Sequence, residues 1–115
     1  MASELILFIE DDDHSRKLLR DALHAVGYQT LESETGEEGV YLATMNRPDL
    51  ILLDIRLPRM NGLQALQQLR AHPDTRCTPV IAVTASVMST EQEALLAAGF
   101  DALEAKPISV LGLLD

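Results

Sequence analysis

The sequence predicts an α/β protein, with five parallel strands covered by helices on both faces, and two observations support this fold class. Short apolar runs alternate with segments of helical periodicity along all 115 residues, which is typical of a parallel sheet. The apolar runs are nearly continuous, as expected for strands that are buried on both faces. The length fits a single domain over residues 1–115, because two separate cores need a longer chain.

The first half of the chain is predicted to hold three strands and two helices. An apolar run at 4–9 reads as a strand and stops at four consecutive acidic residues. Leucines and alanines then recur at helical spacing between residues 18 and 26, with Asp12 or Asp13 as the N-cap and Gly27 at the end. A strand at 28–32, a helix at 36–45 and a strand at 50–53 follow. The last of these is the most apolar run, so we expect it to be the central strand.

The second half is predicted to add two strands and three helices. Asn61-Gly62 is a turn signal that precedes a helix ending near Pro73. The remaining elements are a strand at 79–83, a helix at 91–98, a short strand at 101–105 and a last helix at 108–115. Eight residues are few for a helix, since the average is about three turns. We therefore expect a truncated last helix in a chain cut from a longer protein.

The composition argues against several classes of function. Nine basic and 18 acidic residues give a formal net charge of −9, so nucleic-acid phosphates and anionic membrane surfaces should repel the chain. The single cysteine, Cys77, excludes an internal disulfide and a cysteine-rich zinc site, and it indicates a reducing compartment. No apolar run is long enough to span a bilayer. We expect a cytoplasmic location with no direct contact to nucleic acid or membrane.

Side chains capable of chemistry follow the predicted strands at their carboxyl ends. Glu10 and Asp11 follow the first strand, Asp54 the third, Thr84 the fourth and Lys106 the fifth. Ligands of open parallel sheets bind beyond these ends, so the three carboxylates should converge if the first and third strands are neighbours. Such carboxylates repel one another, and a hard divalent cation such as Mg²⁺ would relieve the repulsion. Each residue alone has an ordinary alternative as a helix cap, a strand former or a solvated lysine.

Five motifs follow one another in a characteristic order. They are Ile6-Leu7-Phe8-Ile9-Glu10-Asp11-Asp12, Pro48-Asp49-Leu50-Ile51-Leu52-Leu53-Asp54-Ile55-Arg56-Leu57-Pro58, Asn61-Gly62, Pro79-Val80-Ile81-Ala82-Val83-Thr84-Ala85 and Lys106-Pro107. Together they resemble the receiver domain of two-component response regulators over essentially the whole chain. The segments around Val83-Thr84-Ala85 and Lys106-Pro107-Ile108-Ser109 are similar to the corresponding segments of single-domain regulators of the DivK type. The resemblance implies a flavodoxin-like (CheY-like), doubly wound three-layer sandwich with strand order 2-1-3-4-5.

For the acidic residues, the resemblance implies a phosphoacceptor site in a two-component phosphorelay. Asp54 would accept a phosphoryl group from a phosphohistidine and form an acyl phosphate, a reaction within the chemistry of carboxylates. Asp11 would bind Mg²⁺ directly and Glu10 partly through water. Asp54 itself and the backbone carbonyl of Arg56 would complete the protein's share of the ligands.

The resemblance also implies a switch and a set of partners. Lys106 would pair with the phosphoryl group and with Asp54, and Thr84 would donate a hydrogen bond to the phosphoryl group. This bond would draw residues 85–89 inward and change the surface of the fourth helix, fifth strand and fifth helix. A histidine kinase or histidine phosphotransfer protein would supply the phosphoryl group, and an effector or a second copy of the chain would read the surface. The domain would be a signalling phosphoacceptor and not an enzyme, apart from phosphorylating and dephosphorylating itself.

Three positions modify these expectations. Leu103 lies three residues before Lys106, where the family usually has Tyr or Phe. We expect Leu103 to pack inward but to respond only weakly to the phosphorylation state. Arg56 and Ser86 lie two residues after Asp54 and Thr84 and should tune the phosphoryl lifetime, although Arg56 can instead pair with Glu10. The peptide bond between Lys106 and Pro107 is expected to be cis.

Three other functions stay open at this point. A haloacid dehalogenase-like phosphatase also uses an Asp nucleophile and Mg²⁺, but normally carries a second Asp two residues later, where this chain has Arg56. A flavodoxin-like binding module needs a Ser/Thr/Gly-rich phosphate loop after the first strand, where this chain has four acids. A pseudo-receiver would bind partners without phosphorylation, although all five key residues are present.

Overall fold

The computed structural model describes residues 4–57, 60–85 and 88–106, and it shows a five-stranded parallel sheet. The strands are β1 (Leu5–Ile9), β2 (Gln29–Ser33), β3 (Leu50–Asp54), β4 (Val80–Thr84) and β5 (Ala102–Ala105). Their order in the sheet is β2-β1-β3-β4-β5, so the expected order 2-1-3-4-5 is confirmed. The helices are α1 (Asp13–Ala25), α2 (Gly36–Asn46), α3 (Gly62–Ala71) and α4 (Ser89–Ala98).

As far as β5, the predicted elements match the observed ones in type and order, and most ends agree within two residues. Asp12 rather than Asp13 caps α1, because its side chain accepts from the backbone N–H of Ser15 at 2.8 Å. Helix α4 begins at Ser89, two residues before the predicted start. The expected last helix and the Lys106–Pro107 bond lie outside the described residues.

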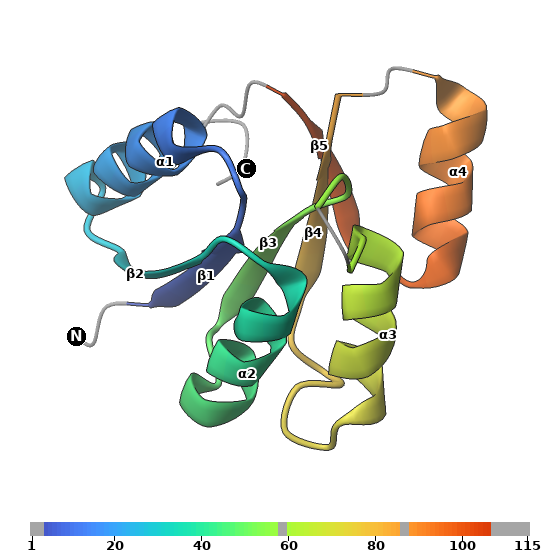
Figure 1. Cartoon of the computed structure of the whole chain (residues 1–115), viewed down its shortest axis with the longest axis horizontal. Coiled ribbons are helices and arrows are strands. Elements are labelled where there is room, and N and C mark those ends of the chain that lie inside the picture. The colour runs from blue at the N-terminus through green and yellow to red at the C-terminus, as the bar shows by residue number, and fades with distance from the viewer. Residues whose placement is uncertain (1–3, 58–59, 86–87, 107–115) are drawn as a thin grey trace.

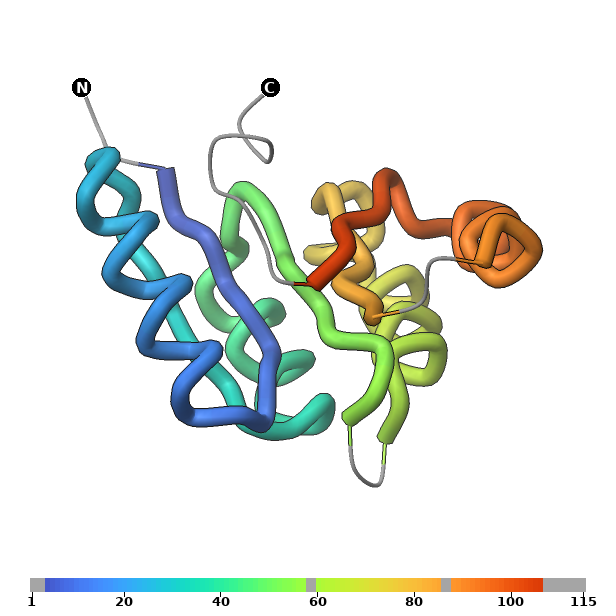
Figure 2. Tube along the Cα trace, turned by 90° about the horizontal axis from the view of Figure 1, so that it is seen from above, coloured from blue at the N-terminus to red at the C-terminus, as the bar shows by residue number. Residues whose placement is uncertain are grey.

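Alternate residues of the strands pack against two separate layers of helices. One core contains Leu7, Leu53 and Ala82 from the strands, together with Ala43 of α2, Leu66 of α3 and Leu95 of α4. The other contains Phe8 and Leu52, which pack with Leu19 and Leu23 of α1. Helices α1 and α4 lie at opposite ends of the molecule in both views (Figures 1 and 2). The sheet is thus the middle layer of the predicted doubly wound, three-layer sandwich.

The topology brings the carboxyl ends of the central strands to one edge of the sheet (Figure 1). Strand β1 pairs with β3 through Ile9 and Leu53, so the next residue of each strand lies at this edge. Strand β3 pairs with β4 through Asp54 and Val83, and β4 pairs with β5 through Thr84 and Ala105. Residues that are far apart in sequence therefore meet here. Among the described helices, none is both long and apolar enough to cross a membrane.

Candidate functional site

Glu10 and Asp11 leave the end of β1 in a turn that is held by backbone hydrogen bonds. The N–H of Glu10 donates to the carbonyl of Ser33 at the end of β2, at 2.9 Å. Glu10 is buried, with 7% of its surface exposed, whereas Asp11 is exposed. The N–H of Asp12 donates to Oε2 of Glu10 at 3.2 Å, which orients that carboxylate before α1 begins.

Asp54 is the last residue of β3 and is 3% exposed. Its Oδ1 accepts a hydrogen bond from the backbone N–H of Arg56 at 2.9 Å. The loop then returns to the strand, where the N–H of Gly62 donates to the carbonyl of Ile55 at 3.0 Å. A Cβ at Gly62 would lie 2.8 Å from the Cα of Ile55, so the start of α3 can approach the strand closely only with glycine there. These contacts fix both the backbone and the carboxylate of Asp54.

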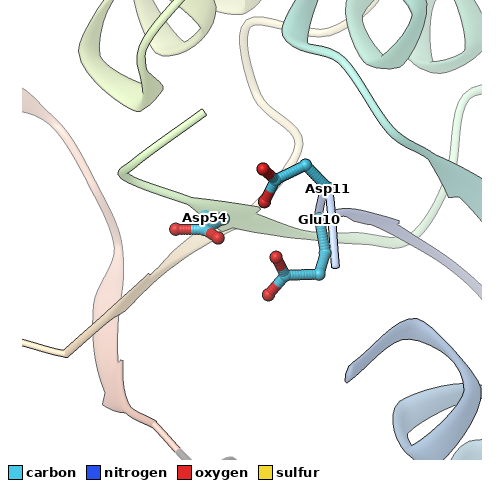
Figure 3. A group of neighbouring side chains, drawn as sticks. All are labelled: Glu10, Asp11 and Asp54. Atoms are coloured by element: carbon cyan, nitrogen blue, oxygen red, sulfur yellow. The ribbon is translucent and has the colours of Figure 1, made fainter. Parts of the chain in front are cut away.

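The carboxylates of Glu10, Asp11 and Asp54 gather in one small space (Figure 3). An oxygen from each lies within 4.8 Å of the others, and Glu10 and Asp11 reach towards Asp54 from the end of β1. This set consists only of oxygen donors and is partly open to solvent through Asp11. Hard divalent cations that keep part of their water shell, Mg²⁺ above all, fit such a donor set. The residues present therefore match the cation that the sequence predicts.

Lys106 supplies the positive charge of the cluster. Its Nζ lies 2.8 Å from Oδ2 of Asp54 and 3.0 Å from Oε1 of Glu10, and its backbone N–H donates to the carbonyl of Thr84 at 3.0 Å. Burial by itself lowers the pKa of the Lys106 ammonium, but the hydrogen bonds to Asp54 and Glu10 outweigh it and leave the pKa raised. The side chain is therefore a permanent cation that bridges two carboxylates.

Burial and its neighbours also perturb Glu10. Desolvation raises its pKa most, a hydrogen bond to Asp54 raises it further, and Lys106 partly opposes both, so that the pKa is about 7. The apolar side chains of Phe8 and Leu52 line a cavity of about 10 Å³ together with Glu10 and Asp54. Glu10 can thus bind a proton near neutral pH in the absence of a cation.

Thr84 and Leu103 are placed by the last two strands. Thr84 ends β4 and is 6% exposed. Leu103 in β5 is partly buried and packs against the core beneath α2, α3 and α4, as expected for an inward side chain. Arg56 is exposed, and the ion pair that Glu10 makes within the described part of the chain is with Lys106 instead of Arg56. Ser86 lies outside the described residues.

Arg16 is the residue near the site that the sequence prediction missed. It is 8% exposed, and its guanidinium donates to the backbone carbonyl of Glu10 at 2.7 Å. A signal was present, because residue 16 shares one helical stripe with Leu19 and Leu23, the other buried residues of α1. A charged residue on the buried stripe of an amphipathic helix needs a buried partner.

The fold and the acidic edge define a receiver domain of the two-component type, and comparison with known proteins agrees. The model of the response regulator receiver domain matches residues 6–115. The chain belongs to this family. The haloacid dehalogenase-like phosphatase and the flavodoxin-like module are thereby disfavoured.

Relatives place the chain within the family. It is 42% identical over 105 residues to the polar-differentiation response regulator DivK of Brucella anthropi. The aligned residues cover 91% of this chain and 85% of the relative. Among solved structures it resembles the receiver domain of the sensor histidine kinase PA1611 of Pseudomonas aeruginosa, which holds a magnesium ion in its active-site cleft. That match has 33% identity and a TM-score of 0.89, and it covers 98% of this chain and 93% of the other. The receiver domain of a Syntrophus aciditrophicus histidine kinase matches with 32% identity and a TM-score of 0.86, covering 97% and 85%.

Proposed function

We propose that Asp54 is the phosphoacceptor of this receiver domain. The observation that carries the proposal is the bridge that Lys106 makes between Asp54 and Glu10, with Asp11 alongside. An oxygen of Asp54 would attack the phosphorus of a phosphohistidine, the phosphorus–nitrogen bond would break, and an acyl phosphate would form on the side chain. Phosphoryl transfer needs mainly positioning and neutralisation of charge, and this cluster supplies both.

The other site residues would share the work of binding and positioning. Asp11 would bind Mg²⁺ directly, with Glu10, Asp54 and the backbone carbonyl of Arg56 as further ligands. When bound, Mg²⁺ would neutralise charge on the phosphoryl oxygens. The Lys106 ammonium would contact the phosphoryl group from the carboxyl end of β5, at the same edge of the sheet.

The switch and the partners extend this proposal. Thr84 would donate a hydrogen bond to the new phosphoryl group and shift the balance between two states of the segment before α4. A histidine kinase or a histidine phosphotransfer protein would be the donor, and an effector or a second copy of the chain would bind the surface of α4, β5 and the residues beyond. Residues 1–115 would act as one receiver domain with only its own phosphorylation and dephosphorylation as chemistry. A cytoplasmic location stays a prediction from the sequence.

Incubation with acetyl phosphate and Mg²⁺, followed by intact mass spectrometry, tests the assignment of Asp54. We expect the wild-type chain to gain the mass of one phosphoryl group and Asp54→Asn to gain none. Asp21→Asn is the matched control, since Asp21 is an exposed aspartate on α1 that pairs with Lys17 at 2.9 Å. It should be phosphorylated like the wild type.

Two outcomes would contradict the proposal in different ways. A chain that binds Mg²⁺ but gains no mass would favour a pseudo-receiver that binds partners without phosphorylation. A gain of mass that persists in Asp54→Asn would place the phosphoryl group on another residue. Omitting Mg²⁺ should slow the reaction in the wild type, which separates the role of the cation from that of the nucleophile.

A further inference from the structure

We propose that Arg16 is a positioning residue for the cation site, because it holds the turn between β1 and α1 in the shape that directs Glu10 and Asp11 towards Asp54. The inference rests on the proposed function in one respect, namely that this acidic cluster binds Mg²⁺. It adds a residue that contacts neither the cation nor the phosphoryl group. Arg16 would act through the backbone of Glu10.

The contacts of Arg16 connect three elements. One nitrogen donates to the carbonyl oxygen of Glu10 at 2.7 Å, in a buried hydrogen bond. A second contacts Asp13 and donates to Glu34 at 3.0 Å, and Nε lies 3.6 Å from Glu32. A guanidinium presents five donors in a rigid fork, so one side chain can serve a carbonyl and several carboxylates at once. Arg16 thereby ties the end of β1 to the first turn of α1 and to the end of β2.

The result is that the backbone of Glu10 is fixed on both sides of its Cα, at the peptide unit before it and at the one after it. The N–H of Glu10 is held by Ser33 at 2.9 Å, and its carbonyl is held by Arg16. That carbonyl belongs to the peptide that leads into Asp11, so its orientation sets the direction in which the two side chains leave the backbone. Without a cation, the carboxylates repel each other and would spread apart if the turn were free. Arg16 opposes this spreading at the backbone.

Electrostatics and positioning predict effects of opposite sign when Arg16 is replaced. Removing a positive charge near a cation site should strengthen cation binding, because like charges repel. Loss of positioning should weaken binding instead, because the ligands must then be ordered when the cation binds. A residue with only a structural role would lower thermal stability and leave Mg²⁺ affinity unchanged or higher. The direction of the change in affinity therefore separates the explanations.

Titration calorimetry with MgCl₂ on the purified chain, at a temperature where circular dichroism shows it folded, measures this direction. We expect Arg16→Gln to bind Mg²⁺ about tenfold more weakly than the wild type, the lower end for losing an outer-shell partner. Arg20→Gln is the matched control. Arg20 lies one turn further along α1 and pairs with Glu32 at 2.6 Å, so its loss removes a contact to β2 without touching Glu10. Its affinity should stay within about twofold of the wild type.

Arg16→Lys keeps the charge but replaces the fork with a single ammonium. It should bind Mg²⁺ with an affinity between those of the wild type and Arg16→Gln, and it decides the matter if Arg16→Gln does not fold. A second readout needs no metal: amide hydrogen exchange of Asp11 and Asp12 in the metal-free chain. Exchange should be faster in both Arg16 variants and unchanged in Arg20→Gln.

The outcomes distinguish this inference from the proposed function. If the wild type binds Mg²⁺ and the Arg16 variants bind it equally or more tightly, Arg16 has no positioning role and the proposed function stands. If the wild type does not bind Mg²⁺ at all, both fail together. Weaker binding and faster exchange in the Arg16 variants alone would support the inference.

Discussion

At the scale of single residues, Lys106 is the cation that offsets part of the negative charge of the site. When all groups are ionised, three carboxylates and one ammonium sum to −3 + 1 = −2, the charge that one Mg²⁺ would cancel. Lys106 lies between Glu10 and Asp54, so it neutralises only part of the cluster. Burial is the largest cause of the raised pKa of Glu10, the hydrogen bond to Asp54 adds to it, and charge repulsion by Asp54 contributes less.

Mg²⁺ affinity should depend on pH through Glu10. Its pKa is raised from 4.5 to about 7, so in the metal-free folded chain the carboxyl is protonated below about pH 7. A ligand must lose its proton to bind the cation, and the affinity should therefore fall as pH falls through 7, by up to about tenfold per pH unit. Calorimetric titrations between pH 5.5 and 8 would measure it, and Glu10→Gln should flatten the dependence. A wild-type affinity that is constant over this range would contradict the raised pKa.

The same pKa has a consequence for stability without metal. For an acid whose pKa is raised by folding, the folded state holds more protons than the unfolded state between about pH 4.5 and 7. The contribution of Glu10 to the free energy of unfolding is thus fully present at low pH and is lost as the pH rises towards 7. Saturating Mg²⁺ should remove this trend, because it keeps Glu10 ionised in the folded state.

The start of α3 shows how one element controls the site at the next scale. Asn61 caps the helix in a capping box with Gln64, and Gly62 lies against the backbone of Ile55, directly after Asp54. These contacts hold the start of α3 against the residue that follows Asp54. The backbone N–H of Arg56 donates to Oδ1 of Asp54, the carboxylate oxygen other than the one that Lys106 contacts.

Gly62→Ala should destabilise the chain, although alanine normally favours a helix over glycine by about 1 kcal/mol. The new Cβ would lie 2.8 Å from the Cα of Ile55 and 3.1 Å from the carbonyl of Asp54, and both are backbone atoms that cannot move alone. We expect a loss of about 1–3 kcal/mol in the free energy of unfolding, measured by urea denaturation. Gln68→Ala, at an exposed position of α3, is the control and should change it by less than about 0.5 kcal/mol. A stabilised Gly62→Ala would show that the contact is relaxed.

Arg70 joins α3 to the loop before β5 at the edge of the sheet opposite to the carboxylates. Its guanidinium donates to the carbonyl of Thr78 at 2.7 Å and to Asp101 at 2.8 Å, and Asp101 also accepts from the N–H of Val80 at 2.8 Å. Arg70→Met should lower the unfolding free energy by about 1–3 kcal/mol and leave Mg²⁺ affinity unchanged. Arg76→Met, in the neighbouring exposed loop, is the control for both measurements. Altered Mg²⁺ binding in Arg70→Met would mean that the two edges of the sheet are coupled.

Cation binding and folding are linked at the scale of the whole molecule. Glu10, Asp11 and Asp54 come from two strands that meet only in the folded chain, so the unfolded chain has no comparable site. Mg²⁺ at a hundred times its dissociation constant should therefore stabilise the fold by about 2.7 kcal/mol. This corresponds to a rise of roughly 10 °C in Tm for a domain of this size. Calorimetric scans with MgCl₂, against KCl of equal ionic strength, check it, and Asp11→Asn should abolish most of the rise.

The order and type of the elements could be predicted because apolar periodicity is a local property of the chain. The start of α4 could not be predicted as well. Its N-cap, Met88, makes no side-chain capping hydrogen bond, so the usual polar N-cap residue is missing at position 88, just before the first helical residue, Ser89. By contrast, Asp12 and Asn61 cap α1 and α3 with side-chain oxygens, and both helix starts are marked in the sequence.

The alternation of strands and helices could be predicted from the sequence alone, and so could the acidic residues at the carboxyl ends of the first and third strands. Parallel strands carry their carboxyl ends to one edge, so the convergence of these residues followed once the neighbours were known. Which atoms contact one another became known only from the three-dimensional fold. Three features depend on distances across the sheet: the contact between Asp54 and Lys106, which lie 52 positions apart in the sequence, the raised pKa of Glu10 and the buried hydrogen bond of Arg16. Burial and charge act through space, and no local pattern of residues encodes their magnitude.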